Sequence, residues 1–244
     1  MNIPMYYVGG SKGGVGKSLV SFALVDYLIS RKLYVLLMDT DTSNPDVYKA
    51  HKDADLPALV CKMCKLDDAD GWADMLNTVE SHPEHVVVIN SAARSNEGTA
   101  NYGELLKAAL AALNRDMITF WVINRHRDSI ELLHSFQHIF SDAPIHVCRN
   151  LHFGTADRFD LFNSSKIKGK VEQTGTTLDF PELASRVVDT LYSGRMPIWQ
   201  AVADLPIGNK VELLRWRARC GEMFDRALPE VRSEIQPEAG GDAA

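Results

Sequence analysis

The sequence predicts an α/β fold in which a mostly parallel β-sheet is flanked by helices on both faces, and three observations support this prediction. Short runs rich in β-branched and aromatic residues alternate with longer segments of helical pattern. Two of the runs, 33–39 and 85–90, are apolar almost throughout, which is typical of parallel strands buried on both faces. The first run, 4–10, leads through a glycine-rich turn directly into a helical segment. Crossover helices of this kind are what parallel strands need to return the chain to the same edge of a sheet.

The individual elements are placed by the same alternation. Apolar runs predict strands at 4–10, 33–39, 85–90, 117–124, 144–150 and 176–180. Helices are predicted at 17–30, 102–114, 128–140, 181–192 and 209–228. The fourth of these helices has a proline in its first turn, where the missing N–H is tolerated. Segment 41–71 shows the least pattern, and we expect short helices around 47–53 and 56–66.

Length and composition fit one globular domain. The chain has 244 residues, of which 45% are hydrophobic and 24% charged, and this is enough to bury a full core. We expect residues 1–235 to form a single domain and the small, polar segment 236–244 to be disordered. The net charge of −6 argues against a nonspecific nucleic-acid coat, although a local basic patch stays open.

Targeting signals are not recognisable in the sequence. The first residues lack the basic flank and apolar run of a signal peptide, and no apolar stretch has membrane-spanning length. Four cysteines are too few for a disulfide framework. We therefore expect a cytoplasmic protein.

The glycine-rich turn after the first strand has the composition of a phosphate-binding loop. It reads SKGGVGKS over residues 11–18. Glycines let the backbone approach an anion, towards which the loop N–H groups and the helix N-terminus point. Lys17 would supply a charge to the β- and γ-phosphates, and the Ser18 hydroxyl would ligate Mg²⁺. The predicted nucleotide-binding residues of this loop are Ser11, Lys12, Gly13, Gly14, Val15, Gly16, Lys17, Ser18 and Leu19.

Two features of the loop depart from the ordinary pattern. Ser11 stands where the pattern has its first glycine, and Lys12 is a second lysine that cannot easily reach the phosphate held by Lys17. A second cation is useful where charge develops in a transition state, for example across an interface. The stretch resembles the deviant Walker A motif of the ParA/MinD family of dimeric ATPases, in the SIMIBI class of P-loop NTPases. This resemblance implies that Lys12 reaches the other subunit's phosphates across a dimer interface; a solvated loop lysine is the alternative.

Two aspartates end the second strand. Carboxylates at the C-terminal end of a parallel strand lie over the ligand crevice, which places Asp39 and Asp41 there. In the ParA/MinD family the same strand ends in D-x-D. The resemblance implies that Asp39 lies near Mg²⁺, through water, that Asp41 positions the attacking water, and that 42–46 is the first switch loop. Lys12, Lys17 and Asp41 are then the catalytic residues. The alternative is that both aspartates cap the next helix.

Asparagines end two further strands. Asn90 stands where the family has the Walker B aspartate, and an amide lacks the charge that holds Mg²⁺-bound water. Slow hydrolysis, or almost none, is the expected consequence. Asn150 stands where the family often reads adenine, and Pro181 lies near the place where its base pocket closes. A plain strand-end cap is the alternative for Asn150.

The order of the later segments is similar to that of the TraL-type proteins of conjugative plasmids. The similar segments are the strand ending at Asn150, LDFPEL, MPIWQAVAD and the basic helix 209–228. Together the resemblances imply an ATP-dependent dimerisation switch that hydrolyses ATP slowly, in plasmid transfer, partition or positioning, with a homodimer and a further protein partner. Two alternatives stay open: an ATP-binding regulator with little hydrolysis, and an ATP-dependent ligase of the dethiobiotin-synthetase type.

Three weaker patterns have two interpretations each. Cys61 and Cys64 have the spacing of half a zinc site, which a homodimer could complete, or are reduced core cysteines on a short helix. Segments 164–175 and 124–128 concentrate positive charge, which fits nonspecific DNA binding or solvated basic loops. The apolar residues of 209–228 are not cleanly on one face, so we expect this helix to pack on the sheet rather than lie on a membrane.

Overall fold

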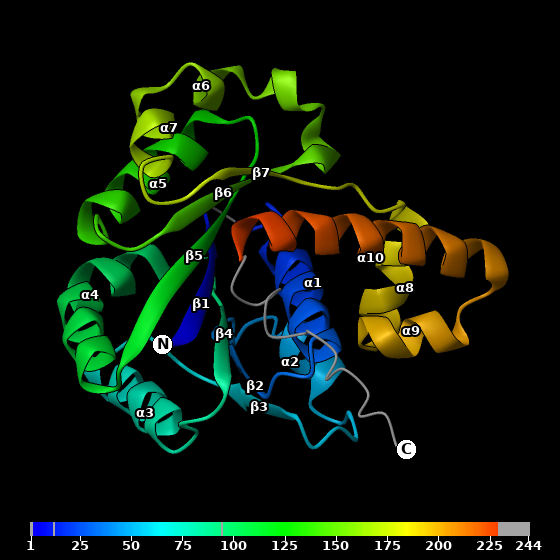
Figure 1. The fold of residues 1–244 in the computed structure, drawn as a ribbon, viewed down its shortest axis with the longest axis horizontal. Coiled ribbons are helices and arrows are strands. Elements are labelled where there is room, and N and C mark those ends of the chain that lie inside the picture. The colour runs from blue at the N-terminus through cyan, green and yellow to red at the C-terminus, as the bar shows by residue number, and fades with distance from the viewer. Residues whose placement is uncertain (1, 12, 94, 229–244) are drawn as a thin grey trace, which may run out of the picture.

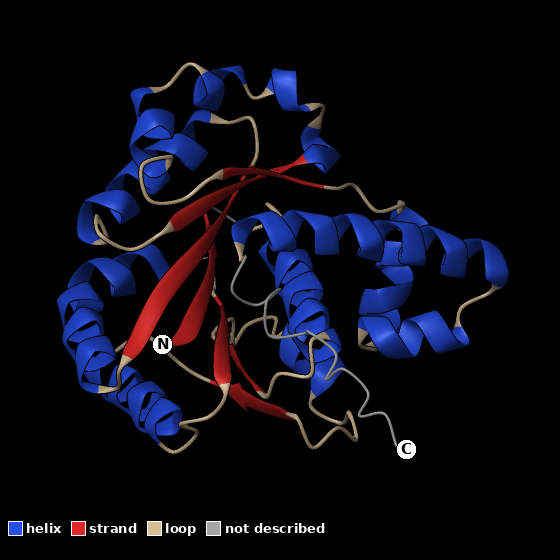
Figure 2. Cartoon of the chain, in the orientation of Figure 1, coloured by secondary structure: helices blue, strands red, loops and turns tan. Residues whose placement is uncertain are grey.

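A computed structural model describes residues 2–11, 13–93 and 95–228 and shows a parallel sheet between two layers of helices (Figures 1 and 2). The strands are β1 (Ile3–Gly10), β2 (Val35–Asp39), β3 (Leu59–Met63), β4 (Val86–Asn90), β5 (Arg115–Ile123), β6 (Ile145–Asn150) and β7 (Thr177–Phe180). Their order across the sheet is β3-β2-β4-β1-β5-β6-β7, and neighbouring strands pair in parallel. The predicted α/β class with a parallel sheet is confirmed.

Helices cover both faces of this sheet. One face carries α1 (Lys17–Ser30), α2 (Asp46–His51), α8 (Ser185–Gly194), α9 (Ile198–Asp204) and α10 (Ile207–Ala227). The other face carries α3 (Ala69–Glu80), α4 (Ser95–Ala112), α5 (Arg127–Ile139), α6 (Asp160–Asn163) and α7 (Lys166–Val171). The short turns η1 (Leu151–Phe153) and η2 (Ala156–Arg158) lead from β6 to α6.

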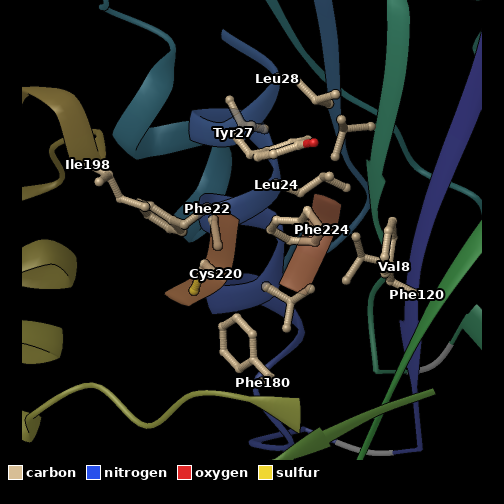
Figure 3. Close-up of a cluster of buried hydrophobic side chains, with 14 of the residues drawn as sticks. Val8, Phe22, Leu24, Tyr27, Leu28, Phe120, Phe180, Ile198, Cys220 and Phe224 are labelled. Carbon is tan, nitrogen blue, oxygen red and sulfur yellow. The ribbon is translucent and has the colours of Figure 1, made fainter. Parts of the chain in front are cut away.

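The buried apolar side chains form one cluster on each face of the sheet. In the first cluster α10 packs beside α1 and also against the sheet, where Phe224 contacts Phe120 of β5, so Leu24 and Phe22 of α1 are buried together with Phe224 (Figure 3). Three polar contacts also join these helices. Arg217 Nε lies 2.6 Å from Asp26 Oδ2, and Asp225 accepts from Tyr27 of α1 and from Arg31 just after it. The last helix is therefore fixed against the helix that follows the phosphate loop.

The sequence prediction is wrong for several elements. Segment 56–66 contains a strand, β3, instead of a helix, because Leu59–Met63 pairs residue by residue with β2 at the edge of the sheet. Helix α4 begins at Ser95, before the predicted start, and the predicted helix 181–192 begins only at Ser185. Helices α6, α7 and α9 were not predicted because they are short. Helix α3 was also missed, although its buried residues Trp72, Met75 and Val79 recur at helical spacing. The predicted tail 236–244 lies outside the described residues.

The topology leaves a crevice at the carboxyl ends of the strands. The connection after β1 leads through α1 towards β2, whereas the connection after β5 leads through α5 to β6 on the other side. Connections that diverge from adjacent strands leave a crevice beyond their carboxyl ends, which is where ligands bind in open α/β sheets. The loops after β1, β2, β4, β6 and β7 surround this crevice.

Candidate functional site

The phosphate loop joins β1 to α1 with two residues in left-handed backbone conformations. Gly14 has φ +80° and Gly16 has φ +104°, a region that costs other residues roughly 1–2 kcal/mol. A Cβ added at Gly13 or Gly14 would meet no atom within 4 Å, so the backbone there faces open space. These glycines leave room for a phosphate at the N-terminus of α1. Lys12 lies outside the described residues, so its predicted role stays a prediction.

A cavity of about 520 Å³ lies beyond the carboxyl ends of the strands. The predicted residues Gly13, Gly14, Gly16, Lys17, Ser18, Leu19, Asp41, Asn150 and Pro181 line it. Loops that are far apart in the sequence therefore meet around one space, which is of a size that a nucleotide needs. Ser11, Val15 and Asp39 do not line it. Ser11 is buried and shares a 2.8 Å hydrogen bond with Ser129 of α5.

Among the described residues that line this cavity, Lys17 is the only lysine or arginine. It is only 7% exposed. Burial lowers the pKa of Lys17 from 10.5 to about 8, and the nearby Asp41 carboxylate acts in the opposite direction. Because burial disfavours the charged form of the ammonium, an anion placed beside it would stabilise that form. The part of the cavity beside Lys17 therefore suits a phosphate.

Asp39 and Asp41 have different environments although they are two residues apart. Asp41 lines the cavity and accepts from the Asn44 backbone N–H at 3.1 Å. Asp39 is fully buried, and both of its carboxylate oxygens accept hydrogen bonds from the protein. Burial raises the pKa of Asp39, opposed by these hydrogen bonds. Asp41 can therefore face a bound ligand directly, whereas Asp39 is used to organise the loop.

Asn90 is part of the same buried network. Its Nδ2 donates to Asp39 Oδ1 at 2.9 Å, and its Oδ1 accepts from the Ser21 hydroxyl at 3.0 Å. Asn90 is 1% exposed and does not line the cavity. The amide thus contacts Asp39, the carboxylate for which the sequence predicts a place near Mg²⁺.

Asn150 and Pro181 line the cavity where β6 and β7 end. Asn150 Oδ1 accepts from the His152 backbone N–H at 3.1 Å and caps η1, which is the capping alternative. Its Nδ2 donates to the carbonyl of Val15 at 2.9 Å, so it also fixes the phosphate loop. The carbonyl of Pro181 accepts from Trp216 Nε1 of α10 at 2.7 Å. Contact of Asn150 or Pro181 with a base stays a prediction.

Asn44 and Asp46, which line the cavity, lie in the predicted switch loop 42–46. Several other residues around the cavity were not predicted from the sequence. They are Ser91, Ala93, His152, Glu182, Leu183, Ser185, Val188, Asp189 and Tyr192. His152 Nδ1 lies 3.3 Å from Glu182 Oε1 at the rim. Several of them could have been found from their place just after a predicted strand, since ligands bind at the carboxyl ends of parallel strands. Ser91, His152 and Glu182 come one or two residues after the ends of β4, β6 and β7.

The two cysteines of the CKMC stretch point to opposite sides of the edge strand. Cys61 packs against the core cluster on the α1 side, and Cys64, just after β3, packs against the cluster on the α3 side. Burial raises the pKa of Cys61 to about 12 and that of Cys64 to about 11. Thiols on opposite faces of a strand cannot share a metal ion, so the structure does not support a zinc site within this chain. Among the described residues, no cluster of three or more metal-ligating side chains occurs.

The charged and apolar surface segments are placed as follows. Segment 164–175 forms α7, which packs against α5, and Arg125 and Arg127 at the start of α5 are exposed. In α10, Met223 and Phe224 are buried in the core, as expected, whereas Val211 and Leu214 are exposed. In the part of the chain that the structure describes, no helix is long and apolar enough to cross a membrane.

The fold and the cavity define a nucleotide-binding domain of the P-loop type, and comparison with known families agrees. The chain belongs to the CobQ/CobB/MinD/ParA family of nucleotide-binding domains, whose family model matches residues 6–148. The ParA/MinD resemblance of the sequence is thereby confirmed. Protein MobD of Acidithiobacillus ferrooxidans is 49% identical over 227 residues, which cover 93% of this chain and 98% of that protein.

Solved structures of similar fold include two nucleotide complexes. A plasmid partition protein from Borrelia burgdorferi B31 bound to AMPPNP is 18% identical, with a TM-score of 0.56 over 91% of this chain and 99% of that chain. The septum site-determining protein MinD of Pyrococcus horikoshii OT3, complexed with Mg-ADP, is 15% identical, with a TM-score of 0.53 over 91% of this chain and 96% of that chain. At these identities the likeness shows the fold.

Proposed function

We propose that this protein is an ATP-dependent dimerisation switch that hydrolyses ATP slowly to ADP and phosphate. One observation carries the proposal: the phosphate loop with Lys17 and the Asp41 carboxylate face the same cavity. A phosphate grip and a carboxylate that can orient a water molecule are the two parts that phosphoanhydride hydrolysis requires of the protein.

The residues of the cavity suit the separate tasks of this reaction. The loop backbone and Lys17 would hold the phosphates, and Ser18 would ligate Mg²⁺. The metal ion, when bound, neutralises charge on the phosphates. Asp41 would orient the attacking water, while Asn150 and Pro181 would lie near the base. Asp39 has both oxygens engaged by the protein, so its influence on Mg²⁺ would run through water or through the loop that it holds.

The relatives support a proposal for the biological process. The 49% identical relative is named MobD, and the segment order is similar to that of TraL-type proteins, so we place this protein in plasmid mobilisation or transfer. A switch of this kind acts through a partner protein that distinguishes the ATP-bound dimer. The exposed arginines near α5 and the lysines of α7 are the surface that nonspecific DNA binding would use.

Molar mass in solution tests the proposal. Light scattering of the wild-type protein without nucleotide, with Mg-ADP and with Mg-ATP should show a dimer only with Mg-ATP. Lys12→Ala should weaken the dimer while ATP still binds, whereas Lys17→Ala should lose ATP itself. A mass that stays unchanged in Mg-ATP, despite measured ATP binding, would refute the switch.

A nucleotide-binding regulator with little hydrolysis is the second candidate, and Asn90 favours it. Its amide is occupied by Ser21 and Asp39 and leaves no carboxylate at this position. ATP binding and dimerisation without phosphate release would identify this case. A ligase acting on a small acid is disfavoured, because Glu182 and Asp189, which line the cavity, would repel a carboxylate substrate.

A further inference from the structure

The loop between β2 and α2 is held at both of its ends by one carboxylate. Asp39 Oδ1 accepts from the Asp41 backbone N–H at 3.2 Å, and Asp39 Oδ2 accepts from the Tyr48 backbone N–H at 3.0 Å. Segment 41–48 includes Asp41 and Asn44, and both of these residues line the cavity. The position of these cavity residues therefore depends on where the Asp39 carboxylate lies.

The Asp39 carboxylate is in turn held by a chain of hydrogen bonds with a fixed direction. Ser21 of α1 donates to Asn90 Oδ1 at 3.0 Å, and Asn90 Nδ2 donates to Asp39 Oδ1 at 2.9 Å. All three side chains are at most 1% exposed. A carboxylate can only accept, so the residue at position 90 must present a donor to it, and the Ser21 hydroxyl orients the amide accordingly.

We propose that Asn90 is a positioning residue, which holds the Asp39 carboxylate and through it sets loop 41–48 and the place of Asp41 beside the phosphate loop. The importance of Asp41 for hydrolysis rests on the proposed function. The part of the proposal in which Asn90 holds the loop does not. Asparagine at position 90 is then a requirement of this loop rather than a weakened metal ligand. An aspartate there would place a second carboxylate against Asp39, where like charges repel and the donor is lost.

This inference and the metal-ligand interpretation predict opposite effects for Asn90→Asp. If position 90 acted on Mg²⁺, the new carboxylate would speed ATP hydrolysis and leave the nucleotide-free loop unchanged. If position 90 acts on Asp39, the variant should release the loop. Backbone amide exchange of Asp41 and Tyr48 in the nucleotide-free protein should become about tenfold faster or more, with kcat falling about tenfold and KM for ATP changing less than about threefold.

A swapped pair gives a residue-resolved rescue. In Asn90→Asp combined with Asp39→Asn, the amide at position 39 can donate to the carboxylate at 90 while its oxygen still accepts from Tyr48. Nothing then accepts from the Asp41 N–H, because the amide nitrogen replaces Oδ1. Exchange at Tyr48 should return to within about threefold of wild type, whereas exchange at Asp41 should stay fast. A merely structural defect would affect both amides alike.

Ser21→Ala keeps the inference testable if Asn90→Asp fails to fold. It leaves the Asn90 amide without its orienting hydroxyl and should speed exchange at Asp41 and Tyr48 by about threefold or more. Ser30→Ala is the matched control, because it removes a hydroxyl from the same helix at an exposed position that only contacts the Tyr27 carbonyl.

Two results would overturn the inference. One is unchanged exchange at both amides in Asn90→Asp and in Ser21→Ala, and the other is faster ATP hydrolysis in Asn90→Asp. The exchange measurement needs no hydrolysis. A wild-type protein that binds ATP without hydrolysing it would therefore count against the proposed ATPase, while the exchange data alone would decide the role of Asn90.

Discussion

The depressed pKa of Lys17 makes nucleotide binding sensitive to pH in a defined direction. Burial lowers this pKa from 10.5 to about 8, which corresponds to roughly 3 kcal/mol for keeping the ammonium charged in the nucleotide-free protein. A phosphate beside the ammonium offsets this cost, so binding raises the pKa of Lys17 and takes up a proton. The affinity for ADP without Mg²⁺ should therefore change little around pH 7, where both the Lys17 ammonium and the ADP phosphates are charged. It should fall as the pH rises through about 8, approaching tenfold per pH unit.

Isothermal titration calorimetry measures both consequences. At about pH 8, titrations in two buffers of different ionisation enthalpy should show uptake of roughly half a proton per ADP bound. Asp41→Asn removes the carboxylate that raises the pKa of Lys17, so in this variant the fall in affinity should begin at lower pH. Constant affinity between about pH 7 and 9, with no proton uptake, would refute the reasoning.

The same pKa has a consequence for stability without nucleotide. The native pKa of Lys17 lies below that of the unfolded chain, so between about 8 and 10.5 the unfolded chain binds more protons than the native protein. The free energy of unfolding should therefore gain a favourable contribution from this residue as the pH rises through that interval. Urea unfolding of wild type and Lys17→Met across the interval isolates this contribution.

Two further predictions concern single side chains. Gly16→Ala should weaken ADP binding by about tenfold or more, because φ is +104° and the added Cβ would meet the Asn150 amide nitrogen. Gly169→Ala in α7, which has nothing within 4 Å and does not line the cavity, is the matched control, and equal losses in both would contradict the argument. Arg217→Met should lower the free energy of unfolding by about 3 kcal/mol, because Asp26 is buried and loses its ion-pair partner. Burial already raises the pKa of Asp26, so ionisation of this carboxyl destabilises the native state. The loss of unfolding free energy caused by Arg217→Met should therefore grow from about pH 5 to 8. A loss that does not change with pH in urea unfolding would count against this explanation.

The sequence predicts the centre of the molecule better than its edges. Strands β1, β2 and β4 are recognisable because most of their residues are buried on both faces and are therefore apolar almost throughout. The edge strand β3 is half exposed and carries lysine at position 62, so its pattern could not be told from that of a short helix. The phosphate loop could be found because its chemistry lies in consecutive residues.

The rest of the site could not be predicted in the same way, because its parts come together only through the sheet. Asn90 can be recognised as an unusual residue at the end of a strand. That it donates to Asp39, and that Ser21 orients it, depends on β2 and β4 lying side by side and on α1 packing over them. The rim residues His152 and Glu182 are likewise 30 positions apart in sequence and meet at the cavity.

The position of β1 in the sheet has a consequence for how the site can move. Strand β1 is bonded to β4 on one side and to β5 on the other, so the segment that grips phosphate emerges from the middle of the sheet. Strand β2 is likewise paired on both sides, with β3 and β4, but the loop that follows it is fastened largely by side chains. A change in the hydrogen bonds of the Asp39 carboxylate would move this loop without breaking any strand pairing, and would leave the cooperative core intact. Under the proposed function, such a division would let a single domain report its bound nucleotide through one loop without partial unfolding.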